Sequence, residues 1–289
     1  MKYSFFPKFF KVIFCGLNVL ILALTALTDP MPADTDTASV TKVRTYTLMD
    51  AYITGQGYDS DDEYYYSSGA ISAFKAAGIA KIDKKTGEII AANYFALPND
   101  LRKLGYDHIG DITVANGYIY APVEDVDEIQ PLVLLYSADT LEYTGVYYEL
   151  DNTYLPDGIP WCANDENYLY TSAYHDADKL LAFNIDDMSF SHAVELTHKL
   201  DRNQGGDLEN GVLYMNTDPK QGNKEVWAID PVTGETTLLF DRNTTGVAGT
   251  EAEGICVETA EDGTLTFRIA DYNKILSTVI KSYTLKIGG

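Results

Sequence analysis

The sequence predicts an all-β fold built from five copies of a four-stranded antiparallel unit. The first observation is a short strand-like run with alternating aromatic residues, which recurs at 64–67, 118–121, 168–171, 212–215 and 264–267. The third residues of successive runs lie 54, 50, 44 and 52 positions apart. A repeat of about 40 to 55 residues indicates an array of similar structural units. No helical pattern competes with it after residue 40.

A tight turn is the second observation. It appears at 82–88 as Ile-Asp-Lys-Lys-Thr-Gly-Glu and at 229–235 as Ile-Asp-Pro-Val-Thr-Gly-Glu, with looser versions at 137–140 and 184–188. Asp accepts hydrogen bonds from its own turn, Pro presets φ and Gly adopts positive φ, so each segment predicts a hairpin. Four-stranded units at this spacing are the blades of a β-propeller. We therefore predict a five-bladed β-propeller of four-stranded antiparallel blades.

The last repeat has only three predicted strands, at 254–258, 265–270 and 278–286, before the chain ends. A ring of blades needs its first and last members joined, because its ends otherwise form an open seam. We predict that the N-terminal segment Val43–Asp50 supplies the fourth strand and closes the last blade.

The N-terminus has the pattern of a secretory signal. Lys2, Lys8 and Lys11 precede an apolar run of 16 residues from Val12 to Leu27. The run is shorter than the roughly 20 residues that cross a bilayer as a helix, and an uncleaved membrane anchor is the alternative. We expect residues 1–33 to be a signal peptide or anchor, 34–42 a linker and 43–289 a single propeller domain. The mature protein is then secreted, periplasmic or extracellular.

The composition limits the classes of function that the chain can have. The chain has 289 residues, 46% of them hydrophobic, which suffices for a core. Its formal net charge of −22 excludes an electrostatic nucleic-acid binder. We expect a monomer with no organic cofactor and no membrane contact beyond the N-terminal segment. Cys162 and Cys256 could pair once, but each lies in an apolar strand-like run, which favours two separate buried thiols.

The turns that lead into the innermost strands are the candidate functional site. In a propeller these strands line the central channel, so their entrance residues converge on one mouth. The first polar position of each entrance is Gln56, His108, Asp157, Gln204 or Glu251, and Asp59, Asp111, Asp207 and Glu253 lie close by. The competing interpretation is that the Asp residues only shape turns.

We assign roles from side-chain chemistry. A ring of carboxylate and amide oxygens suits Ca²⁺, which takes 6–8 oxygen ligands, and Asp157, Asp207, Glu251 and Glu253 are the candidate metal ligands. Gln56, Asp111, Asp157, Trp161 and Gln204 are the candidate ligand-binding residues. Catalysis is assigned to His108 and Glu251. His108 is the one imidazole at a blade entrance, where we expect a neighbouring carboxylate to raise its pKa.

We expect the remaining histidines and acidic runs to have no role in the channel. His175 is expected in a loop, His192 on a fourth strand and His198 in a linker. The acidic run 59–63 is a weaker calcium candidate, because it lacks the Gly of an EF-hand loop. The acidic run 124–128 is expected to be a solvated hairpin loop.

Several of these segments resemble known propellers. The Ile-Asp-x-x-Thr-Gly-Glu turns resemble those of quinoprotein-like and YVTN-type propellers. Residues 54–69 are similar to the first blade of glutaminyl cyclotransferases, which are five-bladed, although this sequence has His108–Asp111 and Asp157–Trp161 where that family carries further Glu and Trp signatures. Glu251–Ile255 looks like the Glu-x-Glu-Gly-Ile of phytase-like and gluconolactonase-like propellers, in which such acids help bind calcium.

Three functions stay open. The first is a calcium-assisted hydrolase of the lactonase, esterase or phosphoesterase kind, with His108 moving the proton. The second is a non-enzymatic propeller that binds a protein or glycan. The third is a glutaminyl-cyclotransferase-like acyltransferase, as the resemblance implies.

Overall fold

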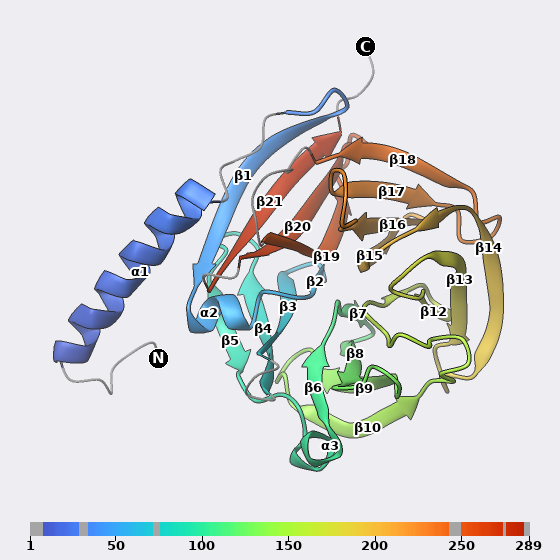
Figure 1. Cartoon of the computed structure of the whole chain (residues 1–289), viewed down its shortest axis with the longest axis horizontal. Helices are drawn as coiled ribbons and strands as arrows, with labels where there is room; N and C mark the ends of the chain where they lie inside the picture. Colours follow the sequence, from blue (N-terminus) through green and yellow to red (C-terminus); the bar gives the residue numbers. More distant parts are fainter. Residues whose placement is uncertain (1–7, 29–33, 72–75, 243–249, 274–275, 286–289) are drawn as a thin grey trace.

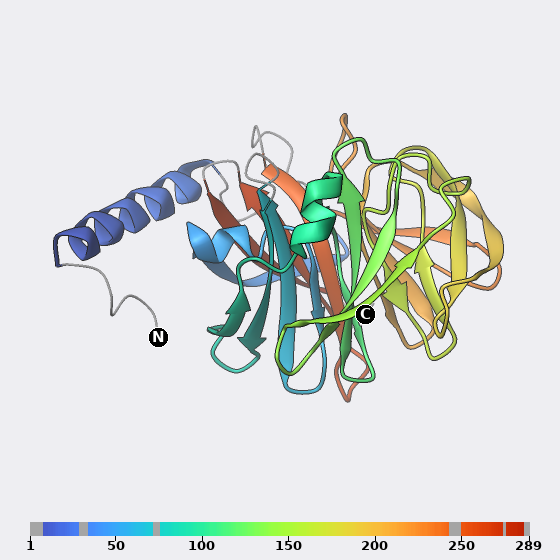
Figure 2. The same ribbon diagram turned by 90° about the horizontal axis from the view of Figure 1, so that it is seen from below.

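The computed structural model describes residues 8–28, 34–71, 76–242, 250–273 and 276–285. Figure 1 looks down the axis of a ring of five antiparallel sheets, and Figure 2 shows the ring from the side. In four of the sheets the strand that comes first in the chain lies nearest the axis and the last lies on the rim. In the fifth sheet β19 is innermost and the N-terminal strand β1 lies on the rim. The predicted five-bladed β-propeller is therefore confirmed.

The first four blades follow the chain. Blade 1 contains β2 (Tyr58–Ser60), β3 (Tyr64–Ile71), β4 (Ala76–Asp83) and β5 (Ile89–Asn93). Blade 2 contains β6 (Tyr106–Ile109), β7 (Thr113–Ala115), β8 (Tyr118–Asp125), β9 (Leu132–Ser137) and β10 (Tyr143–Glu149). Its innermost strand is split, because β6 and β7 both pair with β8. Blade 3 contains β11 (Ala163–Asn164), β12 (Tyr168–Thr171), β13 (Ala177–Asn184) and β14 (Phe190–Leu200). Blade 4 contains β15 (Asn203–Glu209), β16 (Val212–Thr217), β17 (Glu225–Ile229) and β18 (Thr236–Asp241).

Blade 5 joins the two ends of the chain. It contains β19 (Thr250–Thr259), β20 (Leu265–Asn273), β21 (Ser277–Leu285) and, on its outer edge, β1 (Ala38–Thr47). The predicted closure by an N-terminal strand is confirmed. The strand begins at Ala38 rather than Val43 and takes in part of the expected linker, because β21 offers pairing partners along its whole length, from Ser277 to Leu285.

Three helices accompany the sheets in the part of the chain that the structure describes. The first, α1 (Lys8–Thr28), lies outside the ring beside β1 (Figure 1), where Thr25 Oγ1 donates to Ser277 Oγ at 2.7 Å. None of the helices among the described residues is long and apolar enough to cross a membrane. The short helices α2 (Met49–Tyr52) and α3 (Asn99–Leu104) were not predicted. Each spans less than two turns, too few residues for a helical period to be visible in the sequence.

The apolar core is divided among the interfaces between blades. Five clusters of buried side chains each join two neighbouring blades, and one of them joins blade 5 to blade 1. The repeated aromatic position supplies Tyr66, Tyr120, Tyr170 and Tyr214 to these clusters, all of them buried. In the fifth repeat the buried aromatic is Phe267, one residue further along. The predicted separate buried thiols, Cys162 and Cys256, are also confirmed.

Candidate functional site

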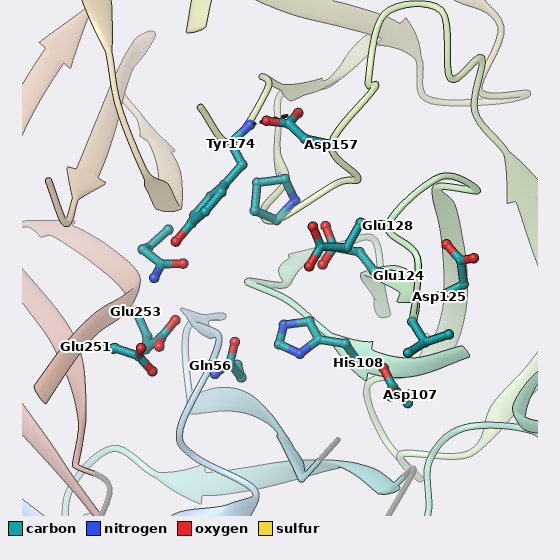
Figure 3. Close-up of a pocket in the computed structure, with 13 residues that line it drawn as sticks. Gln56, Asp107, His108, Glu124, Asp125, Glu128, Asp157, Tyr174, Glu251 and Glu253 are labelled. Atoms are coloured by element: carbon teal, nitrogen blue, oxygen red, sulfur yellow. Dashed lines mark hydrogen bonds between the residues drawn. The ribbon is translucent and has the colours of Figure 1, made fainter. Parts of the chain in front are cut away.

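A pocket lies at the end of the channel where the chain enters the innermost strands. Its cavity volume is about 350 Å³, and all five blades line it. The five predicted entrance residues, Gln56, His108, Asp157, Gln204 and Glu251, share this pocket (Figure 3). The other lining residues are Asp107, Glu124, Asp125, Val126, Glu128, Pro160, Tyr174 and Glu253. Seven of the lining side chains carry carboxyl groups, and none of the described lining residues is Lys or Arg.

Irregular backbone directs several of these side chains. The strand register shifts by one residue at Asp107 in β6, at Gln204 in β15 and at Glu253–Gly254 in β19. A bulge of this kind breaks the regular alternation of side chains and re-aims one of them. Asp107, Gln204 and Glu253 all line the pocket. Three blades therefore use an extra residue to present a polar group to the axis.

Two glycines permit the close approach of the blades. Gly158 has a φ of +83°, and a Cβ at this position would collide with the carboxyl group of Glu124. At Gly254, a Cβ would lie 2.5 Å from the backbone nitrogen of Tyr58 and 2.6 Å from Oδ1 of Asp111. At Gly254 only a residue without a side chain fits, whereas at Gly158 a Cβ would push the Glu124 carboxyl group aside.

Asp111 forms the floor under the pocket rather than part of its lining. Its carboxyl group accepts hydrogen bonds from the backbone N–H groups of Tyr58 (2.8 Å), Gly206 (3.0 Å) and Ile255 (3.4 Å). Its own N–H donates to the carbonyl of Pro160 at 2.9 Å. Burial raises the pKa of Asp111 well above its usual range, and the N–H donors oppose that rise. This one residue of blade 2 connects all the other blades at the axis.

The equivalent Asp residues of blades 1 and 4 also join neighbouring strands. Asp59 accepts from the backbone N–H of Val114 in blade 2, and Asp207 accepts from that of Val257 in blade 5, each at 2.6 Å. Neither lines the pocket. Asp207, a predicted metal ligand, lies deeper along β15 than Gln204, so the four predicted metal ligands do not share one cavity.

A group of possible metal ligands lies at this deeper level. Among the described residues, the only three His, Cys, Asp or Glu side chains whose ligand atoms all lie within 4.8 Å of one another are Asp59, Asp207 and Cys256. The carboxyl groups that line the pocket form no such group within the described part of the chain. Calcium binding at the mouth therefore stays a prediction.

Trp161 is placed away from the pocket. Its side chain is fully buried in the cluster between blades 3 and 4, and its ring Nε1–H donates to Ser172 Oγ at 3.1 Å. Gly206 packs directly against its ring. Of the residues predicted to bind a ligand, Trp161 and Asp111 thus belong to the framework below the pocket.

His108 and Glu124 form one wall of the pocket. They lie directly opposite each other on β6 and β8, and such cross-strand pairs have Cβ atoms about 4.5–5.5 Å apart. Burial, with help from the neighbouring Glu128, raises the pKa of Glu124 to about 8. Burial lowers the pKa of His108 to about 4. At pH 7 the carboxyl group is mostly protonated and the imidazole is neutral.

Two expectations are wrong at this wall. A neighbouring carboxylate was expected to raise the pKa of His108, but Glu124 is itself held in its neutral form and loss of solvent dominates. The run 124–128 was expected to be a solvated loop. Instead Glu124 and Asp125 are the last two residues of β8, Asp125 is buried, and both line the pocket with Glu128, so the exposed turn within this run is limited to residues 126–128.

Glu251 and Glu253 face the pocket from β19, across from His108 and Glu124 (Figure 3). The Glu253 residue is 3% exposed. Its carboxyl group has no hydrogen-bond or ion-pair partner within the described part of the chain. Burial raises the pKa of Glu253 well above its usual range, and Glu251 adds to the rise. This carboxyl group is therefore largely buried and directed at the cavity, and the charges of Lys224 and Arg202 act on it without forming an ion pair.

The third wall comes from blade 3. Asp157 accepts hydrogen bonds from the backbone N–H groups of Tyr174 (3.3 Å) and His175 (2.9 Å). The Tyr174 ring extends toward the side of the pocket that holds Glu251 and Glu253 (Figure 3). Burial raises the pKa of Tyr174, so that its hydroxyl stays protonated and able to donate.

The other three histidines lie outside the pocket. His175 is in a loop, as predicted, and its Nδ1 lies 2.9 Å from Asp201 Oδ1. His192 is on β14, as predicted. His198 also lies on β14 and stacks on Trp227, so its assignment to a linker is wrong, because pairing with β13 extends this strand to Leu200.

Comparison with known proteins identifies the architecture. The chain is similar to a glutaminyl cyclase from Myxococcus xanthus, with 13% identity and a TM-score of 0.57 over 86% of this chain and 97% of that one. It is also similar to a family 43 β-xylosidase/α-arabinofuranosidase from a compost metagenome (11%, TM-score 0.56, 84% and 95%) and to the RS223 β-xylosidase (12%, 0.55, 84% and 94%). No protein-family model and no curated protein sequence matches. At these identities the likeness concerns the fold, which hosts enzymes of different chemistry.

Proposed function

We propose that the pocket is the active site of a hydrolase that cleaves a carboxylic ester or lactone. The observation that supports this most strongly is the His108–Glu124 pair. The two groups lie opposite each other in one cavity, and their pKa values are displaced in opposite directions. At neutral pH one is a proton acceptor and the other a proton donor, the combination that acid–base catalysis needs.

In the proposed reaction His108 accepts a proton from water as the water oxygen bonds to the carbonyl carbon. Glu124 donates its proton to the alkoxy oxygen as the bond between that oxygen and the carbonyl carbon breaks. The products are the carboxylic acid and the alcohol. The proton on His108 then passes to the Glu124 carboxylate, which restores both groups. Because the acid and base are cross-strand neighbours, this return path is short.

The same adjacency favours carbonyl chemistry over displacement at a sugar carbon. Inverting glycosidases hold their acid and base about 6.5–9.5 Å apart, on opposite sides of the bond that breaks. Glycoside hydrolysis is nevertheless the second candidate, because Glu251 and Glu253 lie across the pocket from Glu124 (Figure 3). The fold of the family 43 enzymes is consistent with it. In that case Glu251 would act as the base and His108 would be dispensable.

A substrate panel tests these alternatives. Purified protein is assayed with nitrophenyl esters, lactones, nitrophenyl glycosides and an N-terminal glutaminyl peptide, each with calcium and with EDTA. We expect ester or lactone hydrolysis, lost in Glu124→Gln and His108→Ala but kept in two control variants outside the pocket, Glu261→Gln at an exposed position and His192→Ala at a half-buried one on β14. Glycoside cleavage that survives His108→Ala would favour the second candidate. No turnover of any substrate would favour a binding propeller. Activity abolished by EDTA and restored by calcium would show that a cation assists.

A further inference from the structure

We infer that the wall formed by Glu251, Glu253 and Tyr174 binds an organic ammonium group, so that the substrate carries a positive charge on the side away from the bond that is cleaved. The binding is argued from the cavity and its charges. Only the statement that the bound molecule is then hydrolysed rests on the proposed function.

The unpartnered carboxyl group of Glu253 is the first argument. A buried carboxyl group that lacks both a hydrogen-bond donor and a counter-ion is energetically costly, so such groups are nearly always paired. Glu253 is 3% exposed and lines a cavity large enough for a small molecule. A ligand that brings a positive charge and N–H donors supplies what the chain does not.

Two cations, Lys224 and Arg202, act electrostatically on Glu253, and each is engaged with other groups. Lys224 Nζ lies 3.4 Å from a carboxylate oxygen of Asp218 and donates to the carbonyl of Thr250 at 2.7 Å. Arg202 lies 3.4 Å from the same Asp218. Burial raises the pKa of Glu253, Glu251 and Asp218 add to the rise, and the two cations only oppose it. Within the described part of the chain, no cation therefore forms an ion pair with the Glu253 carboxyl group.

The charged residues that line the pocket favour a positively charged ligand. Seven carboxyl groups and no Lys or Arg occur among the described lining residues, which disfavours a phosphate or carboxylate ligand. The wall that holds Glu251 and Glu253 faces the His108–Glu124 wall across the cavity (Figure 3). A molecule with its charge at the first wall can present a carbonyl group to the second.

An organic cation fits this wall better than a metal ion does. No three ligand atoms of the pocket's His, Asp and Glu side chains, among the described residues, lie within 4.8 Å of one another, whereas Ca²⁺ requires 6–8 oxygens in its first shell. An ammonium group has at most three N–H donors to satisfy. Glu253 offers carboxylate oxygens for them, and Glu251 and the hydroxyl group of Tyr174 line the pocket beside it.

Isothermal titration with two probes of the same shape tests the inference. Cyclohexylammonium chloride and cyclohexanol are titrated into the full chain at neutral pH, and calcium chloride is titrated separately. We expect the ammonium probe to bind at least about 10-fold more tightly than the alcohol, since hydrogen bonds between charged groups are roughly twice as strong as those between neutral groups. Glu253→Gln should remove this difference, and the exposed control Glu261→Gln should keep it.

Each outcome has a definite meaning. Equal binding of the two probes by wild type overturns the inference without reference to any variant. Calcium binding that depends on Glu253, with no ammonium binding, overturns it in favour of a metal site. Ammonium binding that persists in Glu124→Gln, with no hydrolysis of any ester by wild type, supports the cation site and refutes the proposed function alone. Ester hydrolysis by wild type without tighter binding of the ammonium probe supports the proposed function and refutes the cation site.

Discussion

The rate of hydrolysis should trace a broad bell with pH, because the reactive state needs His108 neutral and Glu124 protonated. Acidification through the His108 pKa of about 4 protonates the base, and alkalinisation through the Glu124 pKa of about 8 ionises the acid. The rate should therefore fall on both sides of a plateau. With ordinary pKa values the required pair of states would occupy about 1% of molecules or less at any pH, so burial raises its population by about two orders of magnitude.

The assay is kcat/KM for a neutral ester from pH 3.5 to 9.5, with folding checked by circular dichroism at each pH. Glu124→Gln should lower kcat/KM by about 10²–10⁴-fold, the usual contribution of a positioned acid, and should remove the alkaline limb from any residual activity. A single limb near pH 6.5, the pKa of a solvated imidazole, would refute the reasoning, as would a Glu124→Gln variant that keeps the wild-type profile.

Two further predictions separate the site from its framework. Gly158→Ala should lower hydrolysis strongly, because the new Cβ displaces the Glu124 carboxyl group. The control Gly117→Ala has a similar φ of +80° but open space around it, so it should lower stability alone. Equal activity of the two variants would contradict this prediction. Asp111→Ala should lower the free energy of unfolding by about 3–5 kcal/mol, measured in urea, because three N–H groups of three blades lose their acceptor. The exposed control Asp100→Asn should change it by less than about 0.5 kcal/mol, and an Asp111→Ala variant as stable as that control would show that the floor is not held by this carboxyl group.

The Asp111 floor explains why the site and the fold are hard to separate by mutation. The carboxyl group that connects the blades lies against Gly205 and Gly254, which adjoin the lining residues Gln204 and Glu253 in the chain. Variants at Gln204 or Glu253 act on the pocket, because these side chains stand on bulges above the floor. They are therefore the better probes of function.

The fold was predictable because its signals are local. An aromatic residue in the second strand of each repeat must enter the space between two sheets, and Tyr66, Tyr120, Tyr170 and Tyr214 do so. The Asp–Gly turns encode their own geometry through hydrogen bonds such as that from the Thr86 N–H to Asp83 at 2.7 Å. Convergence of the five entrance residues then follows from the closure of the ring.

The catalytic partner of His108 was not predictable in this way. Glu124 stands in an acidic run that looks solvated, and its contact with the pocket depends on the pairing of β6 with β8 across the bulge at Asp107. A one-residue change of register would turn it to the other face of the sheet. No pattern in the sequence states that register, although a Glu that directly follows the buried apolar segment Tyr120–Val123 is a signal that could have been used.

By itself the amino-acid sequence determined the number of blades, the strand that closes the ring and the five polar residues at its mouth, because period, turn chemistry and alternation are properties of neighbouring residues. Only the tertiary structure decided which acids are buried, which of them are neutral and which hold the blades together. Those properties depend on desolvation and on N–H donors contributed by other blades, and neither exists until the ring has closed.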